Sequence, residues 1–86
     1  MARYELEISR TAEKQLRRLH NADQRRVARK MSSLAHDPFP KGTRKLAGYD
    51  DIFRIRVGPY RILYSVGAAT LIIIILKVGH RGDIYR

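Results

Sequence analysis

The sequence predicts an α+β domain in which a helical hairpin packs on one face of a small, mainly antiparallel sheet. Three features support this fold class: a short alternating segment near the N-terminus, two amphipathic segments between residues 9 and 36, and a second half rich in strand-forming residues. The expected order of elements is β-α-α-β-β-β. A chain of 86 residues has room for one hydrophobic core, so we expect a single domain over residues 1–86.

The first strand is expected at residues 4–8, where Tyr4, Leu6 and Ile8 alternate with glutamates. A helix follows, because Ser9 is a suitable N-cap and apolar side chains then recur at helical spacing. The predicted inner stripe of this helix is Ala12, Leu16 and Leu19.

A second helix is expected after a break at His20-Asn21. Asn21 followed by Gln24 resembles a capping box, and Val27, Met31 and Leu34 form the inner stripe. Pro38 is expected to close the helix. Two short helices joined by so tight a turn pair as a hairpin, and their apolar stripes need a sheet to cover.

The stretch from residue 37 to residue 51 is the least regular part of the chain. Two prolines and two glycines exclude a long element, so we expect a loop that holds one short edge strand near residues 44–46.

A two-stranded hairpin is predicted at residues 53–64. Apolar residues alternate with arginines along its first strand, and Gly58-Pro59 forms the turn. A two-residue loop fixes the register and pairs Val57 with Tyr60, Ile55 with Ile62, and Arg56 with Arg61. Tyr60 then has the apolar parity of its strand and is expected in the core. The arginines at 54, 56 and 61 are expected on the sheet face that points away from the helices, where such a group of like charges suits a polyanionic ligand.

The apolar run Leu71-Ile72-Ile73-Ile74-Ile75-Leu76 is predicted to be a central strand covered on both faces, because its pattern does not alternate. It is too short to cross a bilayer as a helix.

The chain is strongly basic, with 18 lysines and arginines against 8 acidic residues and a formal net charge of +10. An acidic partner is therefore expected, in the order nucleic acid, acidic protein and, last, an anionic membrane surface. There is no cysteine, and the N-terminus lacks the apolar stretch of a signal peptide, so a cytoplasmic protein is expected. The three histidines are scattered without carboxylate partners at ligand spacing, so neither a metal nor a cofactor is expected.

Three segments stand out together: Leu46-Ala47-Gly48, the hairpin from Phe53 to Tyr64, and the C-terminal stretch Lys77-Val78-Gly79-His80-Arg81-Gly82-Asp83-Ile84-Tyr85-Arg86. In combination they resemble the RelE/ParE toxin superfamily of bacterial and archaeal toxin–antitoxin systems. The resemblance spans nearly the whole chain. It implies a toxin with a cognate acidic antitoxin; RelE-like members cleave mRNA in the ribosomal A site, whereas ParE-like members inhibit DNA gyrase.

In the RNase branch, basic residues on the central strands bind the scissile phosphate and a C-terminal tyrosine orients a base. The residues at the resembling positions are Arg54, Arg56, Arg61, Arg81 and Tyr85, and further substrate contacts are expected from Lys45, Lys77 and Arg86. Arginine suits charge stabilisation but is a poor general base.

His80 is the one residue of the matched motif with a suitable ordinary pKa for a general base. Arginine neighbours would lower that pKa and keep the imidazole neutral. The alternative is that His80 only caps its strand.

We therefore expect a ribosome-dependent mRNA endoribonuclease that needs no metal or cofactor and leaves a 2′,3′-cyclic phosphate. Its expected partners are the antitoxin, the ribosome and mRNA, with operator DNA bound only through the antitoxin complex and no membrane. The alternatives are a ParE-like gyrase inhibitor and a non-catalytic basic domain that serves only in a complex bound to operator DNA.

Overall fold

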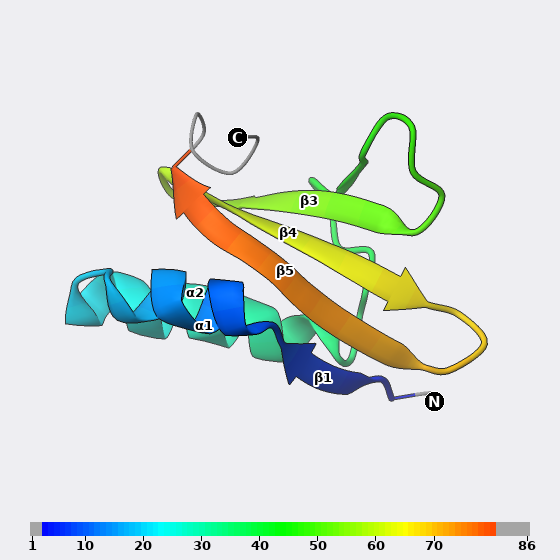
Figure 1. The fold of residues 1–86 in the computed structure, drawn as a ribbon, viewed down its shortest axis with the longest axis horizontal. Coiled ribbons are helices and arrows are strands. Elements are labelled where there is room, and N and C mark those ends of the chain that lie inside the picture. The colour runs from blue at the N-terminus through cyan, green and yellow to red at the C-terminus, as the bar shows by residue number, and fades with distance from the viewer. Residues whose placement is uncertain (1–2, 81–86) are drawn as a thin grey trace.

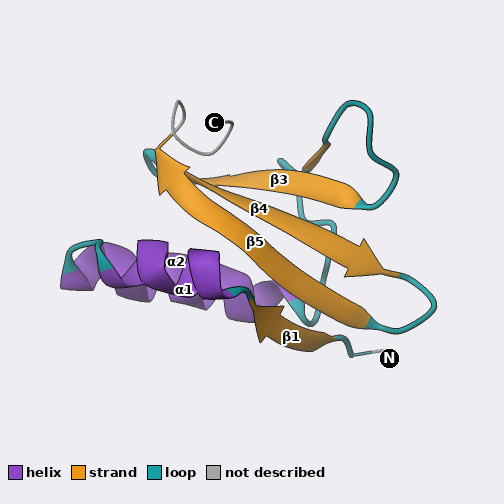
Figure 2. Cartoon of the chain, in the orientation of Figure 1, coloured by secondary structure: helices purple, strands orange, loops and turns teal. Residues whose placement is uncertain are grey.

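Two helices pack on one face of a five-stranded mixed sheet (Figure 1, Figure 2). The computed structural model describes residues 3–80. The elements are β1 (Glu5–Ile8), α1 (Arg10–Arg17), α2 (Asn21–Leu34), β2 (Arg44–Lys45), β3 (Ile52–Val57), β4 (Tyr60–Gly67) and β5 (Ile72–His80). The sheet order is β1-β5-β4-β3-β2, with β1 parallel to β5 and every other pair antiparallel. The expected fold class is confirmed, and the short edge strand of the 37–51 segment adds a fifth strand to the expected order.

The hydrophobic core lies between the helices and the sheet. The helices contribute Ala12, Val27, Met31 and Leu34, and the sheet contributes apolar side chains of β3, β4 and β5. Tyr60 and Tyr64 belong to this core, as the strand parity predicts. None of the helices in residues 3–80 has the length and apolar character needed to span a membrane.

The two helix starts differ in how well the sequence predicts them. Ser9 caps α1 as expected, its hydroxyl accepting the Ala12 N–H at 3.0 Å. The expected capping box of α2 is wrong: the N-cap is His20, which makes no side-chain capping bond. The Gln24 amide instead donates to the Leu19 carbonyl at 2.8 Å, because the tight connection brings the unpaired carbonyls at the end of α1 beside it.

The β3–β4 hairpin has the predicted register, with Val57 opposite Tyr60 and Arg56 opposite Arg61. Gly58 has a φ of +58°, which a two-residue hairpin turn requires. A Cβ at Gly58 would lie 2.9 Å from the Arg26 guanidinium, so α2 also packs closely on this turn.

Burial along β5 differs from the expectation. Its side chains alternate, with Ile73 and Ile75 buried and Ile72 and Ile74 only half-buried. The strand buried almost throughout is β4, because it is the middle strand and long side chains of β3 and β5 flank its outer face. β5 is an interior strand between β1 and β4, as expected, but the prediction that both of its faces are covered was wrong.

A β-bulge in β5 changes the side on which its last residues lie. Tyr64 pairs with Ile75 but Leu63 pairs with Lys77, so Leu76 is an extra residue on β5. The bulge reverses the alternation beyond this point. Beyond the end of β1, side chains supply hydrogen-bond partners to the backbone of β5. The Ser9 hydroxyl donates to the Leu76 carbonyl at 2.9 Å.

A side chain of α1 pairs with a further backbone group on the same edge of β5. The Gln15 side-chain oxygen accepts the Val78 N–H at 2.7 Å. Polar contacts from α1 therefore fix the helix against β5, in addition to the apolar core.

Candidate functional site

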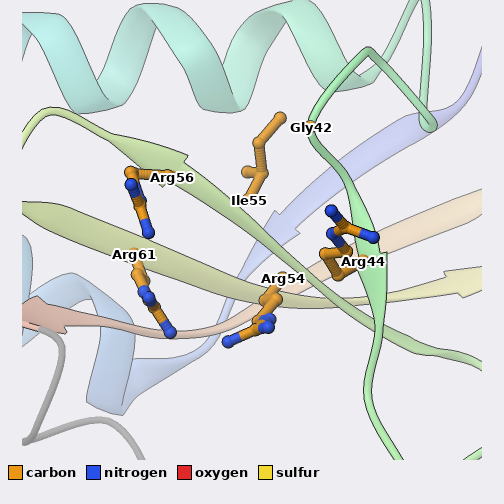
Figure 3. Close-up of a pocket in the computed structure, with 6 residues that line it drawn as sticks. All are labelled: Gly42, Arg44, Arg54, Ile55, Arg56 and Arg61. Atoms are coloured by element: carbon orange, nitrogen blue, oxygen red, sulfur yellow. The ribbon is translucent and has the colours of Figure 1, made fainter.

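An arginine cluster lies in a depression of about 320 Å³ on the sheet face that points away from the helices (Figure 3). β2, β3 and β4 supply its basic side chains. The lining residues are Gly42, Arg44, Arg54, Ile55, Arg56 and Arg61. The strand pairing explains the cluster, because Arg44 is opposite Arg54 and Arg56 is opposite Arg61, so each pair shares a face. The expected projection of the three hairpin arginines from this face is confirmed.

The cluster combines one buried cation with more accessible ones. Arg61 is only 8% exposed and is the single charged side chain that is buried within residues 3–80. Arg54 is half-buried, whereas Arg44 and Arg56 are exposed. Among residues 3–80, no carboxylate lines the depression. Guanidinium groups present several N–H donors in fixed directions, so this arrangement suits an anion with several oxygen atoms, such as a phosphate.

Tyr64 holds the loop that forms one rim of the depression. Its hydroxyl donates to the Pro38 carbonyl at 2.7 Å and lies 3.3 Å from the Thr43 hydroxyl. Burial raises the pKa of Tyr64 above its ordinary value of 10.0, and the Asp37 carboxylate adds to this while the Thr43 hydrogen bond opposes it. The loop leads directly into Gly42 and β2. A core tyrosine therefore positions the rim, a role that its strand parity alone does not reveal.

His80 lies on the opposite face of the sheet from Arg54, Arg56 and Arg61. It pairs with Tyr60 across β4–β5, and the two ring centroids are 4.8 Å apart, on the face that packs against the helices. Arg61 pairs with Gly79 and points to the other face. His80 is therefore separated by the sheet from the hairpin arginines, because the bulge at Leu76 reverses the side on which the end of β5 presents its residues.

The Tyr60 hydroxyl in turn donates to the Asp23 carboxylate at 2.9 Å. This hydrogen bond raises the pKa of Tyr60 above its ordinary value of 10.0, with smaller contributions from burial and from the charge of Asp23 that exceed the lowering by Arg26. The contact joins the first turn of α2 to the start of β4, and the His80 ring lies against Tyr60 at a tilted angle.

The other predicted site residues are divided. Lys77 is opposite Leu63 and so shares the outer face of the sheet with the arginine cluster. Lys45 is opposite Phe53, on the helix side, and forms a 4.0 Å ion pair with Asp50. Arg81, Tyr85 and Arg86 lie outside the described residues. The sequence reasoning missed Arg44, because its place opposite Arg54 depends on how β2 pairs with β3.

Comparison with known proteins connects this geometry to a family. The family model described as "ParE toxin of type II toxin-antitoxin system, parDE" matches residues 6–85. The chain belongs to the RelE/ParE toxin superfamily. It is a RelE-family toxin of the type II toxin–antitoxin class.

Relatives named RelE or RelG share this family. A relative named RelE1 in Methanocaldococcus jannaschii is 29% identical over 98% of this chain and 97% of its own. Toxin RelG of Mycobacterium tuberculosis is 41% identical over 56 residues, which cover 62% of this chain and 61% of that protein.

Among solved structures, the archaeal RelE-RelB complex from Pyrococcus horikoshii contains a chain that is 34% identical to this toxin. The match covers 96% of this chain and 99% of that chain, with a TM-score of 0.82. The two-helix, five-strand architecture of this toxin is therefore the RelE architecture.

Proposed function

We propose that this toxin is a ribosome-dependent mRNA endoribonuclease, and the observation that supports the proposal most is the arginine cluster. In such a reaction the 2′-hydroxyl of the RNA attacks the adjacent phosphorus and leaves a 2′,3′-cyclic phosphate. Negative charge builds up on the phosphate oxygens in the transition state, and fixed cations stabilise that charge. Arg61, held in place by burial, and Arg54 beside it supply such cations.

The cluster is suited to charge stabilisation more than to proton transfer. The described residues that line it are four arginines, an isoleucine and a glycine, and none of these is a suitable general base. We therefore propose that the cluster binds and polarises the scissile phosphate, and that the ribosome supplies the substrate geometry. In this scheme Lys77 and the terminal Arg81, Tyr85 and Arg86 contact the RNA, and neither a metal nor a cofactor takes part.

An acidic antitoxin is the proposed partner that holds the toxin inactive in the cytoplasm. The solved relatives include toxin–antitoxin complexes from Pyrococcus horikoshii and Mycobacterium tuberculosis. The formal net charge of +10 favours fast, salt-sensitive association with a negatively charged protein. Operator DNA would then be bound through the antitoxin complex.

Gyrase inhibition is the second candidate function. The matching family model is that of ParE toxins, and the described residues that line the cluster include no evident general base. Both observations favour a binding toxin over a nuclease.

The deciding experiment measures cleavage of ribosome-bound mRNA and gyrase supercoiling with the same preparation of toxin. Two variants of the cluster are tested, Arg61→Ala at a buried residue and Arg56→Ala at an exposed one. The control is Arg18→Ala, which removes the exposed arginine that caps the C-terminal end of α1. Loss of one preorganised electrostatic donor should slow cleavage by about 100- to 1000-fold. The control should cleave like the wild type, and circular dichroism should show folded protein throughout. Intact mRNA together with inhibited supercoiling would reject the nuclease in favour of the gyrase inhibitor.

A further inference from the structure

A second basic depression lies between α2 and β3, next to the arginine cluster. Its volume is about 270 Å³, and its lining residues are Arg26, Arg29, Lys30, Ser33, Arg56 and Val57. Arg56 lines both depressions. The two basic surfaces are therefore continuous, although one faces the open side of the sheet and the other faces α2. We call the second depression the α2–β3 groove.

The cations of the α2–β3 groove have no acidic partners within residues 3–80. The ion pairs in this part of the chain join Arg17 to Glu13 and Lys45 to Asp50, and neither involves a residue of the groove. The carboxylate on the first turn of α2, Asp23, is engaged by Tyr60. Arg26 and Lys30 are four residues apart on one helix face, a like-charge arrangement that is mildly unfavourable by itself. An anion in the groove would relieve it.

Among residues 3–80, no strand separates the two depressions. β2 covers only Phe53 and Arg54 of its neighbour, so residues 55–57 have no strand on that side within the described part of the chain. A ligand can therefore cross the edge of β3 at Arg56 and contact both basic surfaces.

We propose that the α2–β3 groove binds the phosphodiester backbone of the RNA strand next to the scissile phosphate. The strand would run from the arginine cluster over the edge of β3 and into the groove, with Arg56 between the two. Four of the six lining residues are cations, and the single apolar one, Val57, is buried, so the groove offers little to the apolar anchors of a protein partner. A chain of regularly spaced phosphates fits both surfaces. The proposal rests on the proposed nuclease function.

The test is the salt dependence of binding to a labelled oligouridylate long enough to span both surfaces, measured by fluorescence anisotropy with the purified toxin. The test variant is R29Q/K30Q, and the matched control is R18Q/R25Q, which removes two helix charges outside both depressions. Each lost phosphate contact lowers the slope of log K against log salt by about 0.7 for a single strand. For R29Q/K30Q we expect the magnitude of the slope to fall by about 1.4 and the affinity at low salt to fall about tenfold or more. The slope of the control should stay within a few tenths of the wild-type value.

A dinucleotide probe separates the groove from the cluster. R29Q/K30Q should bind it like the wild type, whereas Arg61→Ala should bind it more weakly. Equal slopes for the test and control variants would overturn the groove proposal. It would also be overturned if R29Q/K30Q bound RNA like the wild type but bound a poly-glutamate peptide more weakly. The wild type and R29Q/K30Q could differ in slope as expected while the wild type cleaves no ribosome-bound mRNA. In that case the nuclease proposal fails and the groove remains a nucleic-acid site.

Discussion

Substitution of Tyr64 by phenylalanine tests whether the core of the sheet anchors the rim loop of the arginine cluster. The side chain is completely buried, and its hydroxyl reaches the Pro38 carbonyl and the Thr43 hydroxyl. Tyr64→Phe keeps the ring and its packing, including the 6.1 Å ring contact with Phe53. It therefore removes only the polar tether between β4 and the loop.

The expected loss of stability is about 2 kcal/mol. A neutral hydrogen bond contributes about 0.5–1.5 kcal/mol net, and a buried polar group left without its partner costs about 1–3 kcal/mol. The Pro38 carbonyl, which accepts the 2.7 Å bond, is the group left without its partner. For a domain of this size the loss corresponds to a fall in Tm of about 8–16 °C.

Urea unfolding followed by circular dichroism at neutral pH measures this loss, and Tyr49→Phe is the matched control. Tyr49 is 54% exposed, so the same chemical change there should leave the unfolding midpoint unchanged. The difference in the free energy of unfolding between the wild type and Tyr64→Phe should narrow above pH 10. Because the pKa of Tyr64 is raised in the folded state, the hydroxyl stabilises the fold fully below its ordinary pKa of 10.0, and this stabilisation is lost as the pH rises through the folded-state pKa. If Tyr64→Phe unfolds within about 0.3 kcal/mol of the wild type, the hydroxyl does not tether the loop.

Three further predictions follow from the contacts around the helices. Gln15→Ala should destabilise the fold by about 1–3 kcal/mol in urea unfolding, because the Val78 N–H loses its acceptor; an unchanged midpoint would contradict this. Tyr60→Phe should reduce the loss of stability that the wild type shows as the pH rises above 10, because the bond to Asp23 raises the Tyr60 pKa; equal pH profiles in thermal melts would argue against it. His80→Gln should keep single-turnover cleavage of ribosome-bound mRNA near the wild-type rate, because its ring lies against Tyr60 on the face away from the arginine cluster; a drop of about 100-fold without weaker ribosome binding would restore it as general base.

The hairpin shows what the sequence determines locally. The two-residue Gly58-Pro59 turn fixes the register of β3 and β4, so the facing of Arg56 and Arg61 is readable from loop length and alternation alone. The Ser9 cap is readable for the same reason, since the groups involved are neighbours in the chain. Fold class follows from the same local patterns combined over the whole chain.

The tertiary structure decided the features that depend on distant segments. Gln24 caps the end of the preceding helix because that end lies beside it in space. The place of Arg44 in the cluster depends on the pairing of β2 with β3 across the 37–51 loop.

The position of His80 depends on one extra residue. If the alternation of Ile73 and Ile75 continued unbroken, His80 would project from the face of the arginines, but the bulge at Leu76 turns it toward Tyr60. Whether a strand accommodates a bulge depends on the pairing and capping along its whole length, here including hydrogen bonds from α1 to the edge of β5. Local pattern therefore determined which residues share a strand face within the hairpin, and long-range packing decided which of the candidate site residues meet.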